Sequence, residues 1–195
     1  YFTRFMKILV FFGKPGAGKG TQAALLKEHY NLVHISTGDL FRYNIKNKTP
    51  LGIFAQSYID GGDLVPAQVT IDRLEAEVQK NPNAAGFIFD GFPRTQAQAE
   101  ALDIFLAKQN LNISATVALE ASDDVLVERL LKRGETSGRS DDQDEVKIRN
   151  RFEEYKQKTA PLKSYYQQQN KFHSVDGIGT LEEISERLTQ LIDGI

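Results

Sequence analysis

The chain has 195 residues, a length that predicts one domain with inserts around a substantial buried core. Its 41% hydrophobic and 26% charged residues are ordinary for a folded soluble protein, and its apolar stretches are strand-sized, so the disordered and membrane classes are excluded. A net charge of −2 argues against general nucleic-acid binding, and the lack of cysteine excludes disulfides and thiolate metal sites.

Residues 1–5 precede the first predicted element. They are too few for a secretory signal. Met6 stands directly before the first predicted strand, so we interpret residues 1–5 as a cloning remnant or an alternative start. No address signal is visible, and the cytoplasm is the expected location.

A glycine-rich segment, residues 13–21, follows the apolar run of residues 7–12 and precedes a helical pattern. A strand, a glycine-rich loop with a lysine, and a helix in this order are the context of a phosphate-binding loop. Glycines let backbone N–H groups converge on an anion, and the helix N-terminus adds the positive end of its dipole. Lys19 supplies a mobile charge for the outer phosphates. The segment therefore predicts binding of a nucleoside polyphosphate.

The residue after Lys19 is Gly20, where most phosphate-loop proteins have a serine or threonine that ligates Mg²⁺. Thr21 follows one position later, so we expect the metal to be held through waters and phosphates. Asp90, at the end of a predicted strand, is a candidate that orients metal-bound water, or else a plain loop cap.

Strands and helices alternate along the whole chain. Five apolar or β-branched runs are typical of strands buried on both faces: residues 7–12, 32–35, 87–90, 115–119 and 171–175. Thr180 and Glu183 predict a capping box at the last helix, and Ser122 predicts the N-cap of an earlier one. The pattern predicts an α/β fold with a doubly wound, parallel five-stranded sheet, helices on both faces, and a ligand crevice at the carboxyl ends of the strands.

Two segments exceed this simple alternation. Residues from about 37 to 80 contain two or three helices between strands. Residues from about 134 to 142 form a polar loop with glycines at both shoulders, a candidate lid. The histidines show no ligand spacing and are interpreted as structural: His29, His34 and His173.

Arginines recur after the predicted strands, in the polar loop and on predicted helices, where Arg129 and Arg133 are four residues apart and therefore share one face. They are Arg42, Arg94, Arg129, Arg133, Arg139 and Arg151. Each alone is more often a solvated surface charge. Together they would surround a phosphate chain from several sides, since one guanidinium group is able to donate two hydrogen bonds to the oxygens of a phosphate. This number of arginines predicts a second phosphate site, which a simple nucleotide hydrolase does not need.

The chain resembles the adenylate kinase family from Met6 onward. The matching segments are residues 13–21, 36–39 with Arg42, 61–66, 90–95 with Gln98, 129–139, 151–155 and 159–161. The block at residues 90–95 is specific, as is the Lys-Gly-Thr form of the phosphate loop, which accounts for Gly20. The resemblance implies a P-loop NTPase-type fold with one nucleoside monophosphate kinase domain over residues 6–195. An AMP-binding helical insert would span about residues 36–65 and a short lid about residues 132–142.

The resemblance also implies roles for single residues. ATP would be bound by Gly16, Ala17, Gly18, Lys19, Gly20, Thr21, Arg129, Arg133, Gly177 and Gly179. AMP would be bound by Thr37, Arg42, Asp63, Leu64, Val65, Gly91, Phe92, Pro93, Arg94, Gln98, Arg139 and Arg151. The catalytic charges would be Lys19, Arg42, Arg94, Arg133, Arg139 and Arg151. Asp90 would be the metal residue, acting through water.

The implied reaction is reversible, Mg²⁺-dependent phosphoryl transfer from ATP to AMP, which gives two ADP. The expected partners are these three nucleotides, with no nucleic acid and no membrane, and family members are usually monomers. Longer lids in the family often hold zinc through cysteines, so the absence of cysteine excludes that metal.

Three other functions were weighed against this one. A UMP/CMP kinase would share the scaffold, but by resemblance Thr37 suits adenine, and Gln98 is able to pair with a purine edge. A non-catalytic nucleotide sensor is disfavoured because Lys19 and all the expected arginines are present. An NTPase switch that uses water as acceptor would not need the block at residues 90–95 or the second set of arginines.

Overall fold

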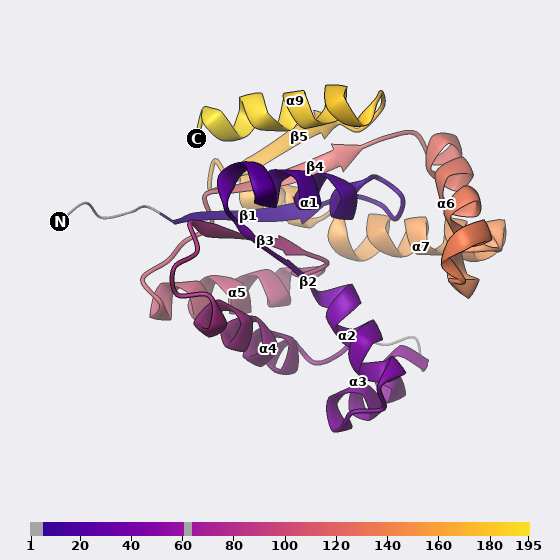
Figure 1. Ribbon diagram of the computed structural model, residues 1–195, viewed down its shortest axis with the longest axis horizontal. Helices are drawn as coiled ribbons and strands as arrows, with labels where there is room; N and C mark the ends of the chain where they lie inside the picture. The colour runs from indigo at the N-terminus through magenta and orange to yellow at the C-terminus, as the bar shows by residue number, and fades with distance from the viewer. Residues whose placement is uncertain (1–5, 61–63) are drawn as a thin grey trace.

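The computed structural model describes residues 6–60 and 64–195. Five strands form one sheet: β1 (Lys7–Phe12), β2 (Val33–Ser36), β3 (Gly86–Asp90), β4 (Ala115–Glu120) and β5 (Phe172–Asp176). All pairings are parallel, and the order across the sheet is β2-β3-β1-β4-β5. The predicted five-stranded parallel α/β fold is therefore confirmed, with β1 at the centre of the sheet (Figure 1).

Helices cover both faces of the sheet because the central strands are apolar on both sides. One face packs against α1 (Lys19–Tyr30), α6 (Asp123–Ser137), α7 (Glu145–Glu154) and α9 (Leu181–Asp193). The other packs against α4 (Ala67–Lys80), α5 (Gln96–Lys108) and α8 (Leu162–Gln167). In Figure 1, α1 and α9 lie on one side of the sheet, and α4 and α5 lie on the other. No helix in either described range is long and apolar enough to cross a membrane.

A helical insert separates β2 from α4. It consists of α2 (Thr37–Lys46) and α3 (Pro50–Asp60), which share a small core of Phe41, Ala55 and Val65. With α4, these make three helices between β2 and β3, at the upper end of the prediction. Because the small core is separate from the main ones, the insert is held to the sheet mainly at its ends.

Helix ends follow the predicted capping chemistry in one case and depart from it in another. Thr180 and Glu183 form the expected capping box at the start of α9. Ser122 occupies the N-cap of α6, but its side chain makes no capping hydrogen bond. Asp123 and Asp124 lie in the first turn of α6, where negative charge favours the helix dipole.

The polar loop predicted over residues 134–142 is mostly helical, so that prediction is wrong. Helix α6 continues to Ser137, and a short 3₁₀ turn, η1 (Ser140–Asp142), follows it. Gly134 lies inside α6, where a Cβ atom would stand 2.7 Å from the backbone oxygen of Asp142. This glycine therefore permits close packing of η1 on the helix and does not mark a turn. A single π-helical turn, η2 (Tyr155–Thr159), joins α7 to the segment before α8.

Tyr166 provides a test of the core beneath α8. Its side chain is fully buried, with the ring centroid 5.7 Å from that of Phe12, but its hydroxyl group has no hydrogen-bond partner among the described residues. A buried hydroxyl without a partner costs about 1–3 kcal/mol. We therefore expect Tyr166→Phe to raise the free energy of unfolding, measured by urea denaturation, by about 1 kcal/mol.

The neighbouring tyrosine supplies the matched control. Tyr165 donates a hydrogen bond from its hydroxyl group to the carboxylate of Asp103. Tyr165→Phe should therefore lower the free energy of unfolding by about 1–2 kcal/mol. If Tyr166→Phe destabilised the protein as Tyr165→Phe is expected to do, the Tyr166 hydroxyl group would have a partner and this interpretation of the core would be wrong.

Candidate active site

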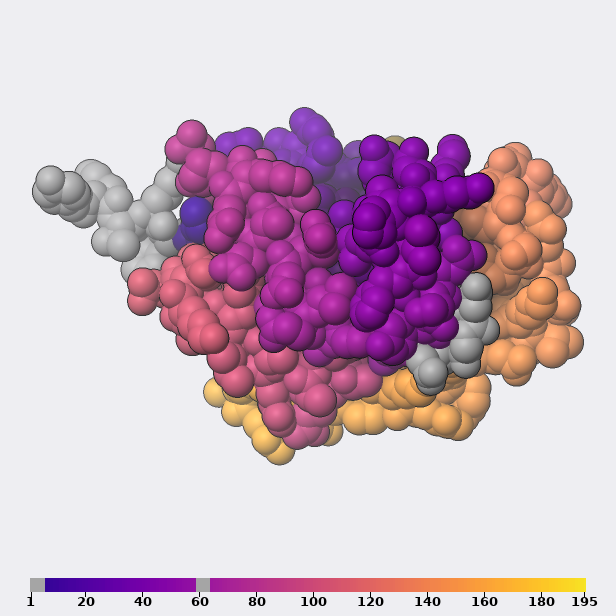
Figure 2. All heavy atoms as spheres, turned by 90° about the horizontal axis from the view of Figure 1, so that it is seen from below, coloured from indigo at the N-terminus to yellow at the C-terminus, as the bar shows by residue number. Residues whose placement is uncertain are grey.

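The predicted site residues lie at the carboxyl ends of the parallel strands. The glycine-rich loop follows β1, Asp90 ends β3, and the loop of residues 177–180 follows β5. The insert and the segment that joins α6 to α7 extend from the same end of the sheet (Figure 1). In Figure 2 the violet atoms of α2 and α3 lie beside the orange atoms of that segment. The sheet therefore brings together residues that are far apart in the sequence.

The glycine-rich loop opens onto the N-terminus of α1. Gly16 and Gly18 have positive φ angles, and the first turn of α1 contains no acidic residue. The Nζ atom of Lys19 donates hydrogen bonds to the backbone oxygens of Gly13, at 2.8 Å, and Lys14, at 3.3 Å. The Lys19 side chain, the N–H groups of the first turn of α1 and the positive end of its dipole therefore lie at the same loop, as an anion site requires.

Lys19 lies among other positive charges. Burial, together with repulsion from Arg94, Arg133 and Arg151, lowers the pKa of Lys19 from 10.5 to about 8, against the opposing attraction of Asp90. These three arginines come from different elements, so the fold has brought them close enough to act on one lysine. Lys19 and these three arginines therefore form an inner group of four predicted cations.

Arg42 and Arg139 lie outside this inner group, next to Asp39. The carboxylate of Asp39 accepts a hydrogen bond from Arg42 and stands 3.8 Å from the guanidinium nitrogen of Arg139. Burial alone would raise the pKa of Asp39, but these arginines hold it below its usual value. Asp39 thus connects the insert with the segment after α6, a connection that the sequence did not predict.

Asp142 is a second residue that the sequence interpretation missed. It is completely buried, and its carboxylate accepts hydrogen bonds from Arg133 Nε at 2.6 Å and from Arg151 at 2.8 Å. Burial by itself would raise its pKa, but the bonds from both arginines hold the pKa below its usual value. In sequence, Asp142 is only the second of two acids in a polar segment, and no pattern distinguishes it from a solvated surface charge.

The segment after β3 forms a tight turn beside the start of α2. Gly91 has a φ of +87°, and a Cβ atom there would stand 2.7 Å from Thr37 Oγ1. Arg94 donates from Nε to the backbone oxygen of Gly91, and its backbone N–H donates to Gln98 Oε1 at 2.7 Å. Thr37, Gly91, Arg94 and Gln98 are therefore neighbours. The side-chain oxygen of Gln98 accepts the hydrogen bond from the Arg94 N–H, which leaves the side-chain NH₂ group to donate to a ligand.

Some predicted ligand contacts are available only through the backbone. Phe92 and Pro93 are buried, and Val65 belongs to the small core of the insert. Leu64 is partly buried. The remaining predicted residue of this segment, Asp63, lies outside the described residues.

Arg129 joins the glycine-rich loop to the loop after β5. Its guanidinium group donates to the backbone oxygens of Gly177, at 2.8 Å, and Gly16, at 3.5 Å. Arg129 and Arg133 are thus on one face of α6, as predicted, but they serve different neighbours: Arg129 contacts backbone and Arg133 contacts Asp142.

Asp90 is the one predicted metal residue, and its surroundings fit an indirect role. It is buried at the end of β3, and its Oδ2 atom lies 3.4 Å from His34 Nε2 and faces Gly20. Within residues 6–60 and 64–195, no three His, Cys, Asp or Glu side chains cluster to hold a metal ion. A single carboxylate at this place suits Mg²⁺ that keeps most of its waters and binds phosphate oxygens.

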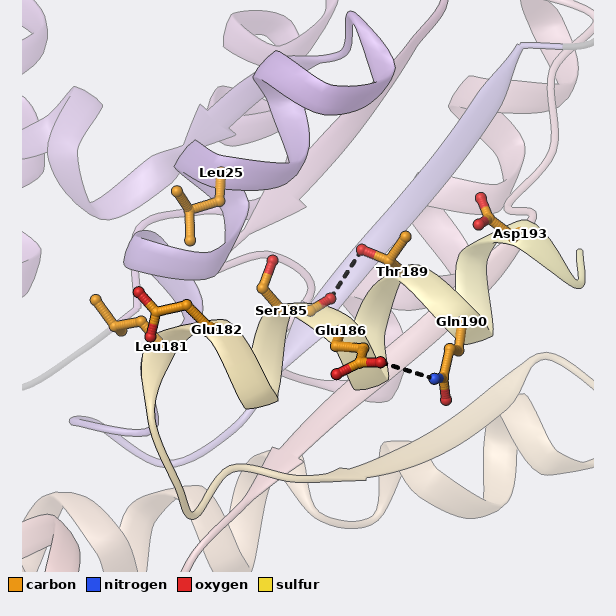
Figure 3. A pocket seen from close by; sticks show the side chains of 8 residues that line it. All are labelled: Leu25, Leu181, Glu182, Ser185, Glu186, Thr189, Gln190 and Asp193. Carbon is orange, nitrogen blue, oxygen red and sulfur yellow. Dashed lines mark hydrogen bonds between the residues drawn. The ribbon is translucent and has the colours of Figure 1, made fainter.

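An open hollow of about 510 Å³ lies elsewhere, between α1 and α9 (Figure 3). It is lined by Leu25, Leu181, Glu182, Ser185, Glu186, Thr189, Gln190 and Asp193. None of these is a predicted site residue, and several are acidic, so the hollow is unsuited to a phosphate chain. The candidate site is the cationic one at the strand ends.

The chain is similar to known proteins over most of its length. A family model described as Adenylate kinase matches residues 11–171. Proteins named adenylate kinase from Flavobacterium psychrophilum and Flavobacterium johnsoniae are 63% and 62% identical over 187 residues, which cover 96% of this chain and 98% of each relative. One from Bacteroides fragilis is 44% identical over 185 residues, 95% of this chain and 97% of the relative. The chain therefore belongs to the adenylate kinase family.

Proposed function

We propose that this adenylate kinase binds Mg²⁺·ATP and AMP on either side of the cation group at the strand ends and transfers a phosphoryl group between them. The supporting observation is the inner group itself, in which Lys19 lies among Arg94, Arg133 and Arg151. A site for one nucleotide needs fewer positive charges. A phosphate chain that extends from ATP to AMP carries enough negative charge to balance all four.

The ATP side is proposed at the glycine-rich loop. The backbone of residues 16–21 would hold the phosphates, with Lys19 at the outer ones. Arg129 would pack against the adenine ring, because its guanidinium plane is fixed between Gly16 and Gly177. Gly177 and Gly179 would border the purine through their backbone.

The AMP side is proposed between the insert and the turn after β3. Arg42 and Arg94 would bind the AMP phosphate, and Thr37 and Gln98 would lie at the purine. The buried side chain of Thr37 and the free NH₂ group of Gln98 support this assignment. A UMP/CMP kinase and a non-catalytic sensor are not favoured, since the curated relatives are named adenylate kinase over nearly the whole chain.

The transfer step needs no protein nucleophile. An oxygen of the AMP phosphate attacks the γ-phosphorus of ATP in line, the new P–O bond forms, and the bond to the β-phosphate oxygen breaks, which leaves two ADP. Lys19, Arg94, Arg133 and Arg151 would stabilise the charge on the transferred group. Asp142 would hold the last two arginines at fixed positions, so that they need not reorganise during the step.

Closure around both nucleotides would exclude water, which otherwise competes as acceptor. The ion pair between Asp39 and Arg139 indicates that the insert and the segment after α6 approach each other at the mouth of the site. Arg42 and Arg139 would leave Asp39 for substrate phosphates, which carry more charge.

Magnesium would be held by the ATP phosphates and by waters that Asp90 orients, and when bound it neutralises charge on the β- and γ-phosphates. The proposal also includes a monomeric enzyme in the cytoplasm, without nucleic-acid or membrane partners.

The acceptor assay tests this function directly. ADP formation is measured with Mg²⁺·ATP and AMP, UMP, CMP or no acceptor. We expect rapid ADP formation with AMP alone. Equal rates with UMP or CMP would place the enzyme with the pyrimidine kinases, and ADP formed without any acceptor would mean hydrolysis and contradict the two-nucleotide site.

The roles of Lys19 and Arg94 predict large losses of turnover. Lys19→Met and Arg94→Ala should each lower kcat by about 10²–10⁴-fold, because each removes a charge that stabilises the transition state. Arg149→Ala is the matched control, since Arg149 is an exposed arginine paired with Glu145 and Asp124.

The free energy of unfolding of the ligand-free enzyme distinguishes a loss of kcat from misfolding of the variant. Because the folded protein lowers the pKa of Lys19 from 10.5 to about 8, the charged lysine costs stability at pH 7, and the cost fades as the pH rises from about 8 to 10.5. Lys19→Met should therefore be at least as stable as wild type at pH 7. Near-normal kcat in both variants would refute the proposed roles.

A further inference from the structure

Arg187 holds the loop that follows β5. This arginine belongs to α9, and its NH1 atom donates hydrogen bonds to the backbone oxygens of Asp176, at 2.9 Å, and Ile178, at 2.6 Å. The same nitrogen lies 3.9 Å from the Asp176 carboxylate. One guanidinium group therefore engages the last carbonyl group of β5 and the Ile178 carbonyl group of the loop that follows, and the proposed mechanism gives it no role.

The inner side of this loop is fixed by other contacts. The backbone N–H of Gly177 donates to the backbone oxygen of Glu120 at 2.7 Å, and the backbone oxygen of Gly177 accepts a hydrogen bond from Arg129. A Cβ atom at Gly177 would stand 3.0 Å from the backbone oxygen of Glu120 and 3.5 Å from the backbone oxygen of Ala17. The loop is thus in close contact with β4 and with the glycine-rich loop at this one residue.

The outer side of the loop is held differently. The Ile178 side chain is 44% exposed and is not part of a core cluster of the described residues. Gly179 has a φ of +129°, a conformation in which glycine has wide freedom. Arg187 is the residue that ties the Ile178 carbonyl group to α9, a helix whose start is fixed by a capping box.

We propose that Arg187 is a positioning residue for the purine of the phosphate donor. This inference rests on the proposed function, in which the backbone of Gly177 and Gly179 borders that purine. Arg187 holds the Ile178 carbonyl group, which sets the direction of the Gly179 N–H in the same planar peptide unit, while the Ile178 N–H donates to the Asp176 carboxylate at 2.9 Å. This peptide unit therefore already has its bound geometry before ATP arrives.

The chemistry of the base explains why backbone direction matters. Adenine presents an amino group that donates where guanine presents an oxygen that accepts. A loop with fixed carbonyl and N–H groups can therefore discriminate between these bases. Without Arg187, the segment from Ile178 to Gly179 must be ordered when ATP binds, and this entropy cost weakens the donor site alone.

The experiment measures steady-state kinetics of Arg187→Ala, Arg187→Lys and the control Arg73→Ala, in which an exposed arginine of α4 is removed. For Arg187→Ala we expect the KM for ATP to rise by about five- to thirtyfold, as for the loss of charge-assisted hydrogen bonds at a partly exposed site. The KM for AMP and the kcat at saturating ATP should stay within about twofold of wild type, because the acceptor site and the transferring charges are untouched.

Two further readouts separate positioning from general structural support. The preference for ATP over GTP should narrow in Arg187→Ala, because loosened backbone groups no longer favour the adenine amino group. Arg187→Lys keeps a positively charged group with several hydrogen-bond donors, so its KM for ATP should lie close to the wild-type value. If Arg187→Ala is too unstable to assay at 25 °C, the comparison of Arg187→Lys with an Arg187→Gln variant, which donates through one NH₂ group, gives the same ordering.

An unchanged KM for ATP in Arg187→Ala would overturn the inference, as would equal rises in the KM for ATP and AMP or an unaltered preference for ATP over GTP. A wild-type enzyme that forms no ADP from ATP and AMP would instead overturn the proposed function. The two failures are therefore distinguishable in the same assay.

Discussion

The constraint on which the rest of this structure depends is the gathering of several cations in one place without a matching number of anions. Lys19 shows the cost, because burial and three neighbouring arginines lower its pKa to about 8. The parallel sheet makes the gathering possible, since the loops after its strands meet at one edge. The free protein thus stores electrostatic strain that a phosphate chain is able to relieve.

Three aspartates limit this strain in the free protein. Asp142 holds Arg133 and Arg151, Asp39 holds Arg42 and lies near Arg139, and Asp90 attracts Lys19 and Arg94. Asp142 is completely buried and suits a permanent role as a support. Asp39 is mostly exposed and suits an exchange in which substrate phosphates replace it. On the proposed function, Asp142 and Asp90 would hold catalytic groups in place and Asp39 would release them.

The five strands, the glycine-rich loop and the set of cations follow from local signals: apolar runs, glycine spacing and arginines behind strand ends. The order of the strands across the sheet does not, because it is set by tertiary packing. The residues that sequence reasoning missed act through tertiary contacts. Gly134 resembles a turn residue, but it lies in α6 because the Asp142 backbone packs against it. Asp142 resembles a surface acid and Arg187 a solvated helix charge, because the partners of both are set by the fold and, for Arg187, are backbone oxygens.

Calorimetry of Mg²⁺·ATP binding at pH 8, in buffers of different ionisation enthalpy, tests the central claim most directly. At a pH equal to its pKa, Lys19 is about half protonated in the free enzyme, and phosphate oxygens beside it would raise that pKa. The account predicts uptake of about half a proton per ATP bound, and none in Lys19→Met. Binding of ATP by the wild-type enzyme without proton uptake would show that the polyphosphate does not neutralise this cation group, and would contradict the account.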